Sequence, residues 1–275
     1  MFKTTINRAA KAVEEAEAII ITSGAGMGVD SGLPDYRGHL GFWRAYPVYE
    51  KLGLCFENCS NPYYFQEDPQ FAWGYYGHCV NLYRDTVPHD GFHILQKWIK
   101  AKNAPYFIVT SNVDAQFQKA GFPEDKIYEV HGSLHWLQCQ TLCNVGIWKN
   151  THHFDVDVST MRAEGALPVC PGCGKVSRPN ALMFGDWLWL SHKAEVQKRE
   201  LDQFIVANAE KKVVVIEMGA GLGIPTIRAR TERFGREFKN TTIIRINPRE
   251  PKIENGIAMK CGALEGMQII DAMLK

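Results

Sequence analysis

The chain has 275 residues, of which 45% are hydrophobic, and its formal net charge is +1. This length is sufficient to bury a large core, and a near-neutral chain without a basic run argues against a nucleic-acid partner. The longest apolar stretches have the length of a strand and are too short to cross a bilayer, and the first residues lack an apolar signal core. We therefore expect a cytoplasmic protein with no membrane and no nucleic-acid partner. The sequence does not indicate its oligomeric state.

Helical and strand-like patterns alternate along the chain. Apolar residues at helical spacing predict a first helix over about residues 4–16. Strand-like apolar runs follow at Ala18–Thr22, Tyr106–Thr110, Val213–Glu217 and Thr242–Ile246, and helical patterns lie at about 92–101, 192–210 and 225–236. This alternation predicts an α/β fold with a doubly wound, parallel, Rossmann-like sheet.

Two stretches break this alternation. Residues 39–91 are rich in aromatic residues and proline and predict a helical insertion, whereas residues 135–181 contain four cysteines and little periodicity. We expect both to form one small zinc-binding and helical module beside the sheet, with the active cleft between the two parts. The chain would then be a single domain over 1–275. Its Rossmann-like part covers about 1–38, 92–134 and 182–275, and its small module covers about 39–91 and 135–181.

A glycine-rich turn follows the first strand directly. A buried strand that runs into such a turn presents backbone N–H groups to a pyrophosphate, and here the turn reads Gly24-Ala25-Gly26. It continues as Ser-Gly-Leu-Pro-Asp-Tyr-Arg-Gly over residues 31–38, which places an acid, an aromatic residue and an arginine just beyond the phosphate site. This is more than pyrophosphate binding needs, and it indicates chemistry at the far end of a dinucleotide.

The cysteines of the second stretch form two close pairs, separated by residues 144–169. Four thiolates in this arrangement suit tetrahedral zinc, and the metal would be structural because sulfur fills all four positions. The predicted ligands are Cys139, Cys143, Cys170 and Cys173. A second pair with the same spacing, Cys55 and Cys59, is the substitute if Cys139 or Cys143 is not a ligand.

Taken together, these motifs resemble the sirtuins, the NAD-dependent protein deacylases. The resemblance covers nearly the whole chain. It rests on the sequence of residues 24–37 and, in family order, on Phe42–Tyr46, Asn61–Pro69, Asn112–Asp114, His131–Leu134, Cys170–Gly174, Arg178–Asn180 and Phe184–Asp186. It implies an enzyme that uses NAD as co-substrate and structural zinc, and that acts on an acyl-lysine protein or peptide.

The resemblance assigns catalysis to His131, Asn112 and Asp114. His131 has an ordinary pKa near neutrality and would take a proton from the ribose of the alkylimidate intermediate formed after nicotinamide leaves. Asn112 and Asp114 follow a strand at the carboxyl end, where ligands of α/β folds bind. Asp114 would accept hydrogen bonds from the nicotinamide carboxamide, and Asn112 would hold a ribose hydroxyl or a water. A structural histidine and an Asx turn are the alternatives.

The remaining NAD contacts are also implied by the resemblance. The glycine-rich turn would bind the pyrophosphate, and Asp35, Tyr36 and Arg37 would cover the nicotinamide ribose, with Tyr36 where the family usually has Phe. A purely structural salt bridge is the alternative for Arg37. The full set of predicted cofactor-binding residues is Gly24, Ala25, Gly26, Asp35, Tyr36, Arg37, Ser111, Asn112, Asp114, Gly219, Ala220, Asn247 and Cys261.

Two departures from the family pattern concern NAD binding. Ser111 replaces the glutamine that usually precedes the Asn-x-Asp motif, which removes a ribose contact. Gly219-Ala220-Gly221-Leu222 replaces Gly-Thr-Ser-Leu, so that only backbone N–H groups remain there for the phosphate or ribose. This segment and residues 112–122 resemble the macrodomain-linked branch, whose members ADP-ribosylate proteins. Mono-ADP-ribosyl transfer and a non-catalytic NAD-binding module are therefore the alternative functions.

Three residues are predicted to contact the peptide substrate: Tyr76, Phe184 and Gly185. The segment at 184–186 matches the one whose backbone pairs with the lysine-bearing strand, with a buried aromatic turn as the alternative. In the acyl-pocket helix, Tyr76 aligns with the tyrosine of Tyr-x-x-Arg and Cys79 with its arginine. Because cysteine offers no fixed charge for an acyl carboxylate, we expect acetyl or longer neutral groups to be preferred, unless a protonated His78 substitutes for the arginine.

Overall fold

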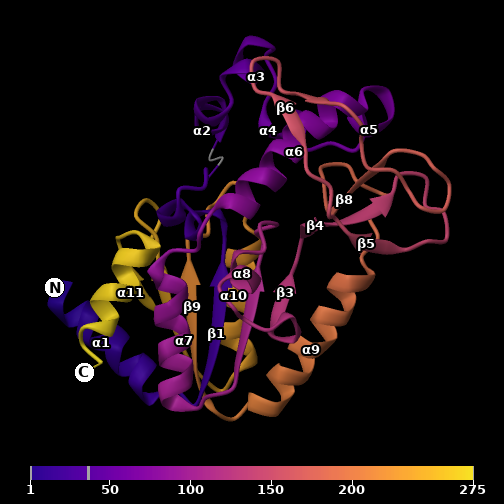
Figure 1. Ribbon diagram of the computed structural model, residues 1–275. Helices are drawn as coiled ribbons and strands as arrows, with labels where there is room; N and C mark the ends of the chain where they lie inside the picture. The colour runs from indigo at the N-terminus through magenta and orange to yellow at the C-terminus, as the bar shows by residue number, and fades with distance from the viewer. Residues whose placement is uncertain (1, 36–37, 275) are drawn as a thin grey trace.

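The computed structural model describes residues 2–35 and 38–274. Its main feature is a parallel sheet with the order β11-β10-β9-β1-β2-β3 (Figure 1). The strands are β1 (Ala18–Ser23), β2 (Tyr106–Thr110), β3 (Ile127–Glu129), β9 (Lys212–Met218), β10 (Asn240–Ile246) and β11 (Ile257–Met259). Read in chain order, this is the Rossmann order 3-2-1-4-5-6, and the predicted doubly wound α/β fold is confirmed.

Alternate residues of each strand face opposite sides of the sheet, and both sides are buried. Ile19 and Ile21 of β1 belong to one hydrophobic cluster, whereas Ala18 and Ile20 belong to another. This explains why the central strands are continuous apolar runs rather than alternating ones.

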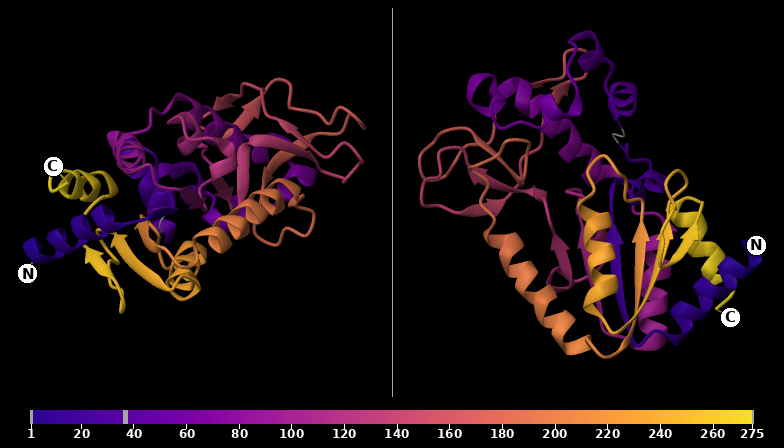
Figure 2. Two further views of the ribbon diagram at one scale, coloured as in Figure 1. Left: turned by 90° about the horizontal axis from the view of Figure 1, so that it is seen from below. Right: turned by 180° about the vertical axis from the view of Figure 1, so that it is seen from behind.

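Helices cover both faces, as the two further views show (Figure 2). The first cluster packs under α1 (Phe2–Glu15), α7 (Asp90–Lys102), α8 (Gln116–Lys119) and α11 (Ala263–Asp271). The second packs under α9 (His192–Asn208) and α10 (Thr226–Glu237). The helices predicted over 4–16, 92–101, 192–210 and 225–236 are thus present, and their ends differ from the prediction by at most two residues.

A smaller group of elements lies above the carboxyl ends of the strands (Figure 1). Its helices are α2 (Gly38–Ala45), α3 (Pro47–Lys51), α4 (Phe56–Cys59), α5 (Tyr64–Glu67) and α6 (Pro69–Asp85). Two small antiparallel sheets accompany them, one of β5 (Ile147–Lys149), β4 (Gly132–Cys139) and β8 (Ser177–Ala181), and one of β6 (Asp155–Asp157) and β7 (Arg162–Glu164). Residues 135–181 therefore contain strands that their weak periodicity did not predict.

Aromatic side chains build the core of this group. Trp73 is fully buried in α6, stacks on Phe154 with ring centroids 4.6 Å apart, and donates its indole N–H to the Ser177 carbonyl. At the start of α6, Asp68 accepts the N–H of Phe71 and pairs with Arg162 of β7. These contacts hold α6 between the two small sheets, with one side toward the cleft.

Candidate active site

A cavity of about 600 Å³ lies at the carboxyl ends of β1, β2 and β9. The strand order reverses between β1 and β9, which is where doubly wound folds bind their ligands. Of the predicted site residues, the lining includes Gly24, Ala25, Asp35, Tyr76, Ser111, Asn112, Asp114, His131, Phe184, Gly219 and Ala220. It does not include Gly26, Gly185, Asn247 or Cys261, and Tyr36 and Arg37 lie outside the described residues.

The glycine turns that follow β1 and β9 pack backbone against backbone. Gly24 N–H donates to the Met218 carbonyl (3.0 Å), and Gly26 N–H donates to the Gly219 carbonyl (3.1 Å). A Cβ on Gly219 would lie 2.3 Å from the Gly26 carbonyl carbon, so only glycine permits this approach. Two of the three N–H groups that we expected to face the pyrophosphate are thus engaged within the protein. This corrects the expectation for Gly24 and Gly26 as N–H donors and leaves Ala25.

Asn112 and Asp114 are fixed to the ends of these strands. The Asn112 amide donates to the Gly24 carbonyl (3.1 Å), which joins the turn after β2 to the turn after β1. An Asp114 carboxylate oxygen accepts the N–H of Gln116 (3.0 Å), so the Asx turn is present while the residue also lines the cavity. Burial, with a smaller contribution from Glu129, raises the pKa of Asp114 to about 6.

His131 lies in the turn between β3 and β4. Its carbonyl accepts the N–H of Leu182, which ties the turn to the chain after β8, and its side chain lines the cavity beside Asn112 and Asp114. Burial lowers the pKa of His131, and a hydrogen bond with the Ser111 backbone partly opposes this shift. The imidazole is therefore neutral at pH 7, the form that can accept a proton.

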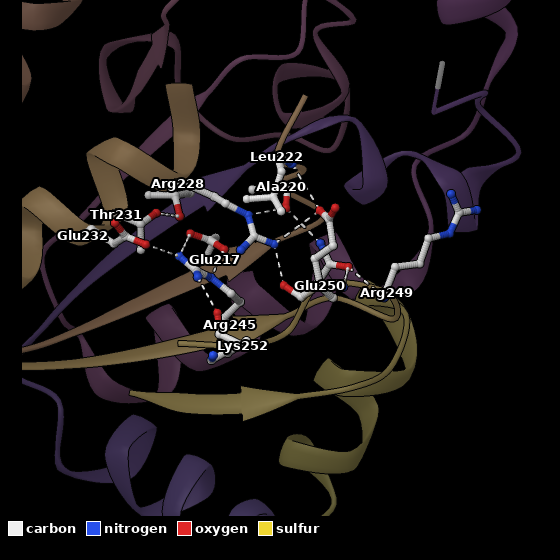
Figure 3. A network of polar contacts seen from close by, with 12 residues as sticks. Glu217, Ala220, Leu222, Arg228, Thr231, Glu232, Arg245, Arg249, Glu250 and Lys252 are labelled. Carbon is white, nitrogen blue, oxygen red and sulfur yellow. Dashed lines mark hydrogen bonds and ion pairs between the residues drawn. The ribbon is translucent and has the colours of Figure 1, made fainter. Parts of the chain in front are cut away.

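Charged side chains support the second glycine turn from behind (Figure 3). The Arg228 guanidinium donates to the Ala220 carbonyl (3.0 Å) and lies 3.6 Å from the Glu250 carboxylate, which accepts the N–H of Leu222 (3.1 Å). Just before the turn, Glu217 of β9 and Arg245 of β10 lie opposite each other and form a buried ion pair. This network fixes the position of the turn at the edge of the cavity.

Asn247 has a structural role in the same region. It is fully buried, its amide donates to the Ala220 carbonyl (2.8 Å), and its oxygen accepts the N–H groups of Arg249 and Glu250. Its side chain therefore shapes the turn between β9 and α10. A contact from Asn247 to a ribose stays a prediction.

Aromatic residues of α6 line the far end of the cavity. The Tyr76 hydroxyl lies 3.0 Å from the Ser60 hydroxyl, and Cys79 lies 3.3 Å from the Tyr46 hydroxyl, which also contacts His78. Burial lowers the pKa of His78, which disfavours its protonated form. Among the described residues that line the cavity none is Lys or Arg.

The predicted peptide-binding segment forms an anchored turn after β8. Asp186 and Arg178 make a buried, bidentate ion pair, and Asp186 also accepts the N–H of Leu188. The turn places Phe184 at the cavity, against Phe56, and leaves Trp187 94% exposed. The buried ion pair thus anchors the turn that carries Phe184 to the cavity.

The four predicted zinc ligands meet at one point. The sulfur atoms of Cys139, Cys143, Cys170 and Cys173 all lie within 4.8 Å of one another. Tetrahedral zinc–sulfur bonds of about 2.3 Å place sulfur atoms roughly 3.8 Å apart, so the cluster fits zinc and leaves no open coordination position. Within the described residues this is the single group of that kind. Cys55 and Cys59, the possible substitutes, are not part of it.

Five polar or charged lining residues were not predicted: Glu57, Ser60, Tyr75, Tyr83 and Glu250. Tyr83 lies seven residues after Tyr76 on α6, and this helical spacing was a signal that it shares the same face. Glu250 follows the carboxyl end of β10, where ligands of α/β folds bind. Glu57 and Ser60 come from a short helix and its end, which carry no comparable signal.

Comparisons with known proteins agree with this geometry. Residues 24–214 match the sequence model of the Sir2 family. An NAD-dependent protein deacylase of Thermus thermophilus is 25% identical over 275 aligned positions, covering 96% of this chain and 93% of that protein. NAD-dependent protein deacylase 2 of Pseudomonas aeruginosa is 30% identical over 183 positions, 65% of each chain. A probable bifunctional ADP-ribose hydrolase/ADP-ribosyltransferase of Fusarium oxysporum is 25% identical over 229 positions, 78% of this chain and 37% of that one.

Solved structures agree at the level of the fold. A Sir2 homologue in complex with NAD has a TM-score of 0.70 at 23% identity, over 98% of this chain and 93% of that chain. No described helix is both long and apolar enough to cross a membrane. With a family match over most of its length and this architecture, the chain belongs to the Sir2 family.

Proposed function

We propose that this protein is an NAD-dependent protein-lysine deacylase that releases nicotinamide and O-acyl-ADP-ribose. The observation that carries the proposal is the position of a neutral His131 in the same cavity as Asn112 and Asp114. A protein that only binds NAD has no use for a base at this place. Relatives named NAD-dependent protein deacylase, similar over most of the chain, support the same reaction.

NAD, when bound, supplies the nicotinamide leaving group and the electrophilic ribose carbon. In our proposal the Ala25 N–H and the turn at Gly219–Ala220, where the Gly219 N–H already donates to the Ile246 carbonyl (3.1 Å), border the pyrophosphate. Asp114 accepts from the nicotinamide carboxamide. Asn112 positions the ribose, and Asp35 lies over it. His131 takes a proton from a ribose hydroxyl, and the backbone at Asn247 and Cys261 borders the adenosine end.

The acyl-lysine enters from the α6 side in this proposal. Phe184 and Gly185 pair with the peptide backbone, and the acyl chain lies against Tyr76 and the neighbouring aromatic residues. A neutral acyl group is favoured because burying a carboxylate without a cationic partner costs free energy. The cleft between the Rossmann-like part and the small module then holds both substrates, with structural zinc remote from the reaction.

Mono-ADP-ribosyl transfer to a protein is the second candidate. It is favoured by the relative named ADP-ribosyltransferase and by the turn at residues 219–222, which lacks hydroxyl groups. The two reactions share cleavage of NAD. They differ in the acceptor and in the need for a base, since transfer to a nucleophilic side chain does not require the ribose hydroxyl to be activated.

The test is product analysis by mass spectrometry with NAD and an acetyl-lysine peptide. We expect O-acetyl-ADP-ribose from the wild type and about a 10²–10⁴-fold lower rate from His131→Ala, with NAD affinity retained. His93→Ala removes an exposed histidine of α7 that does not line the cavity, and it should react at the wild-type rate. ADP-ribosylated protein instead of deacylated peptide, at equal rates in wild type and His131→Ala, would favour the second candidate.

A further inference from the structure

A second cavity, of about 400 Å³, lies behind Asp114. It is bordered by the end of α6, by α8, by β4 and β5, and by the chain that follows β5. Tyr83 and Asp114 line both this rear cavity and the NAD cavity. The two cavities are thus neighbours that share these two lining residues.

The two cavities differ in charge. The carboxylates Asp35, Glu57, Asp114 and Glu250 line the first, without any described Lys or Arg. Arg84, Lys119, Lys149 and His135 line the rear cavity, and besides Asp114 its acidic member is Glu124. Among the described residues, neither Arg84 nor Lys119 nor Lys149 forms an ion pair with a carboxylate.

Backbone carbonyls hold two of these cations in place. Arg84 donates to the carbonyls of Asn150 and His152, and Lys119 donates to those of Arg84 and Thr86 (2.6 Å to Thr86). These acceptors are neutral, so the hydrogen bonds orient both cations without pairing either of them with a carboxylate. Burial is the main cause that lowers the pKa of His135, and a hydrogen bond with the Asp114 backbone opposes it; Arg84 and Lys119 add smaller contributions in the same direction as burial.

The third cation, Lys149, lies near the ring of Trp136. β4 pairs with β5 so that Lys149 lies opposite Trp136, with its ammonium 6.0 Å from the ring centroid. Lys193 lies over the same ring but is paired with Glu129. The rear cavity therefore combines fixed positive charge, a tryptophan face and polar groups, the composition of a site for a small anionic ligand.

We propose that the rear cavity binds a small phosphate-bearing or polycarboxylate molecule, held by Arg84, Lys119 and Lys149, and that its occupancy weakens NAD binding. Binding would bring negative charge to a cavity that three cations line, none of them in an ion pair with a described carboxylate. The volume of the cavity lies at the lower end of the range for small-molecule sites, which suits a small ligand.

The coupling to NAD runs through Asp114, and this part rests on the proposed function. His135 Nε2 lies 3.2 Å from the Asp114 carbonyl, and Asp114 itself borders both cavities. An anion in the rear cavity disfavours the ionised form of Asp114, the form that best accepts from the nicotinamide carboxamide. Since coupling between sites is reciprocal, NAD weakens anion binding by the same factor.

The test uses inorganic phosphate as the probe, followed by ³¹P NMR line width and by thermal shift. We expect saturable binding to the wild type, at least tenfold weaker binding to Lys149→Ala and Lys119→Ala, and unchanged binding to Lys100→Ala. Lys100 is an exposed lysine of α7 that lines neither cavity, and Lys149 is exposed, so both variants should fold normally. Saturating phosphate should weaken NAD binding about fivefold, the lower end of typical coupling.

Three outcomes would overturn the proposal. They are an absence of phosphate binding, equal binding in all variants, and complete displacement of phosphate by NAD, which would place it in the pyrophosphate turn instead. An NAD affinity that does not respond to phosphate would overturn the coupling. Intact phosphate binding in a protein that does not deacylate would instead contradict the proposed function alone, because the binding assay needs no turnover.

Discussion

Gly219→Ala tests the packing of the two glycine turns at the point where the strand order reverses. Gly219 has φ +62°, and its new Cβ would lie 2.3–2.4 Å from backbone atoms of Gly26 and Met27. The left-handed conformation costs an alanine about 1–2 kcal/mol. Separating two packed backbones adds a further amount of about 1–3 kcal/mol, because no flexible side chain can move aside. We expect the free energy of unfolding to fall by about 2–5 kcal/mol.

Gly32→Ala is the matched control. Gly32 also has a positive φ, +88°, but a Cβ there meets no atom within 4 Å. It should therefore cost only the conformational penalty of about 1–2 kcal/mol. Urea unfolding gives both free energies, and calorimetric titration gives the NAD affinity. Because Gly219→Ala displaces the turn that carries Ala25, we expect at least a roughly tenfold weaker NAD affinity, about 1.4 kcal/mol, in that variant alone.

The reasoning fails if the two variants are equally stable and bind NAD equally. Equal stability would mean that the turns separate without cost, so that the hydrogen bonds of Gly24 and Gly26 with the β9 turn contribute nothing. Equal NAD affinity with unequal stability would mean that the position of Ala25 does not depend on Gly219. Each result removes one step of the inference from the fold to the pyrophosphate site.

Three further predictions concern the metal, the acyl group and pH. Elemental analysis should find one zinc per chain, lost in Cys170→Ser and retained in Cys55→Ser; zinc in both variants would contradict the ligand set. The ratio of kcat/KM for acetyl-lysine to that for succinyl-lysine in one peptide should exceed one in the wild type and should fall in Cys79→Arg. A wild-type preference for succinyl-lysine would contradict the expected preference for neutral acyl groups. Because the pKa of Asp114 is raised to about 6, its contribution to stability is complete below pH 4 and is lost as pH rises through 6. Between pH 4 and 7 the free energy of unfolding, measured with urea, should fall less in Asp114→Asn than in the wild type, and the difference should be up to about 3 kcal/mol. The same pH profile in both proteins would exclude the raised pKa.

The main sheet was predictable because its strands are buried on both faces. Continuous apolar runs of strand length, such as Tyr106–Thr110, are typical of strands buried on both faces. The predicted ends of these strands differ from those in the structure by at most two residues. The strands of 135–181 could not be predicted. Several have three residues, and their positions depend on pairing with other strands, β5 with β4 and β6 with β7, rather than on local preference.

The candidate site was predictable to the extent that it follows strand ends. His131, Asn112 and Asp114 each follow a strand of the main sheet, so their meeting in one cavity follows from the parallel topology. The use of the Gly24 and Gly26 amides within the protein was not predictable. It arises from contact between two turns that are far apart in the sequence, which only the strand order of the sheet brings together.

The same topology explains why Asp114 stands between two cavities of opposite charge. The chain after β2 turns back through α8 beneath the end of α6, which places Lys119 and Arg84 on one side of Asp114. The glycine turns of β1 and β9 border the NAD cavity, on its other side, and that cavity is lined by carboxylates and by no described Lys or Arg. An aspartate held between these two fields, with its pKa near 6, responds to charge on either side. Its position gives the fold a physical route by which a second ligand changes the affinity of the first.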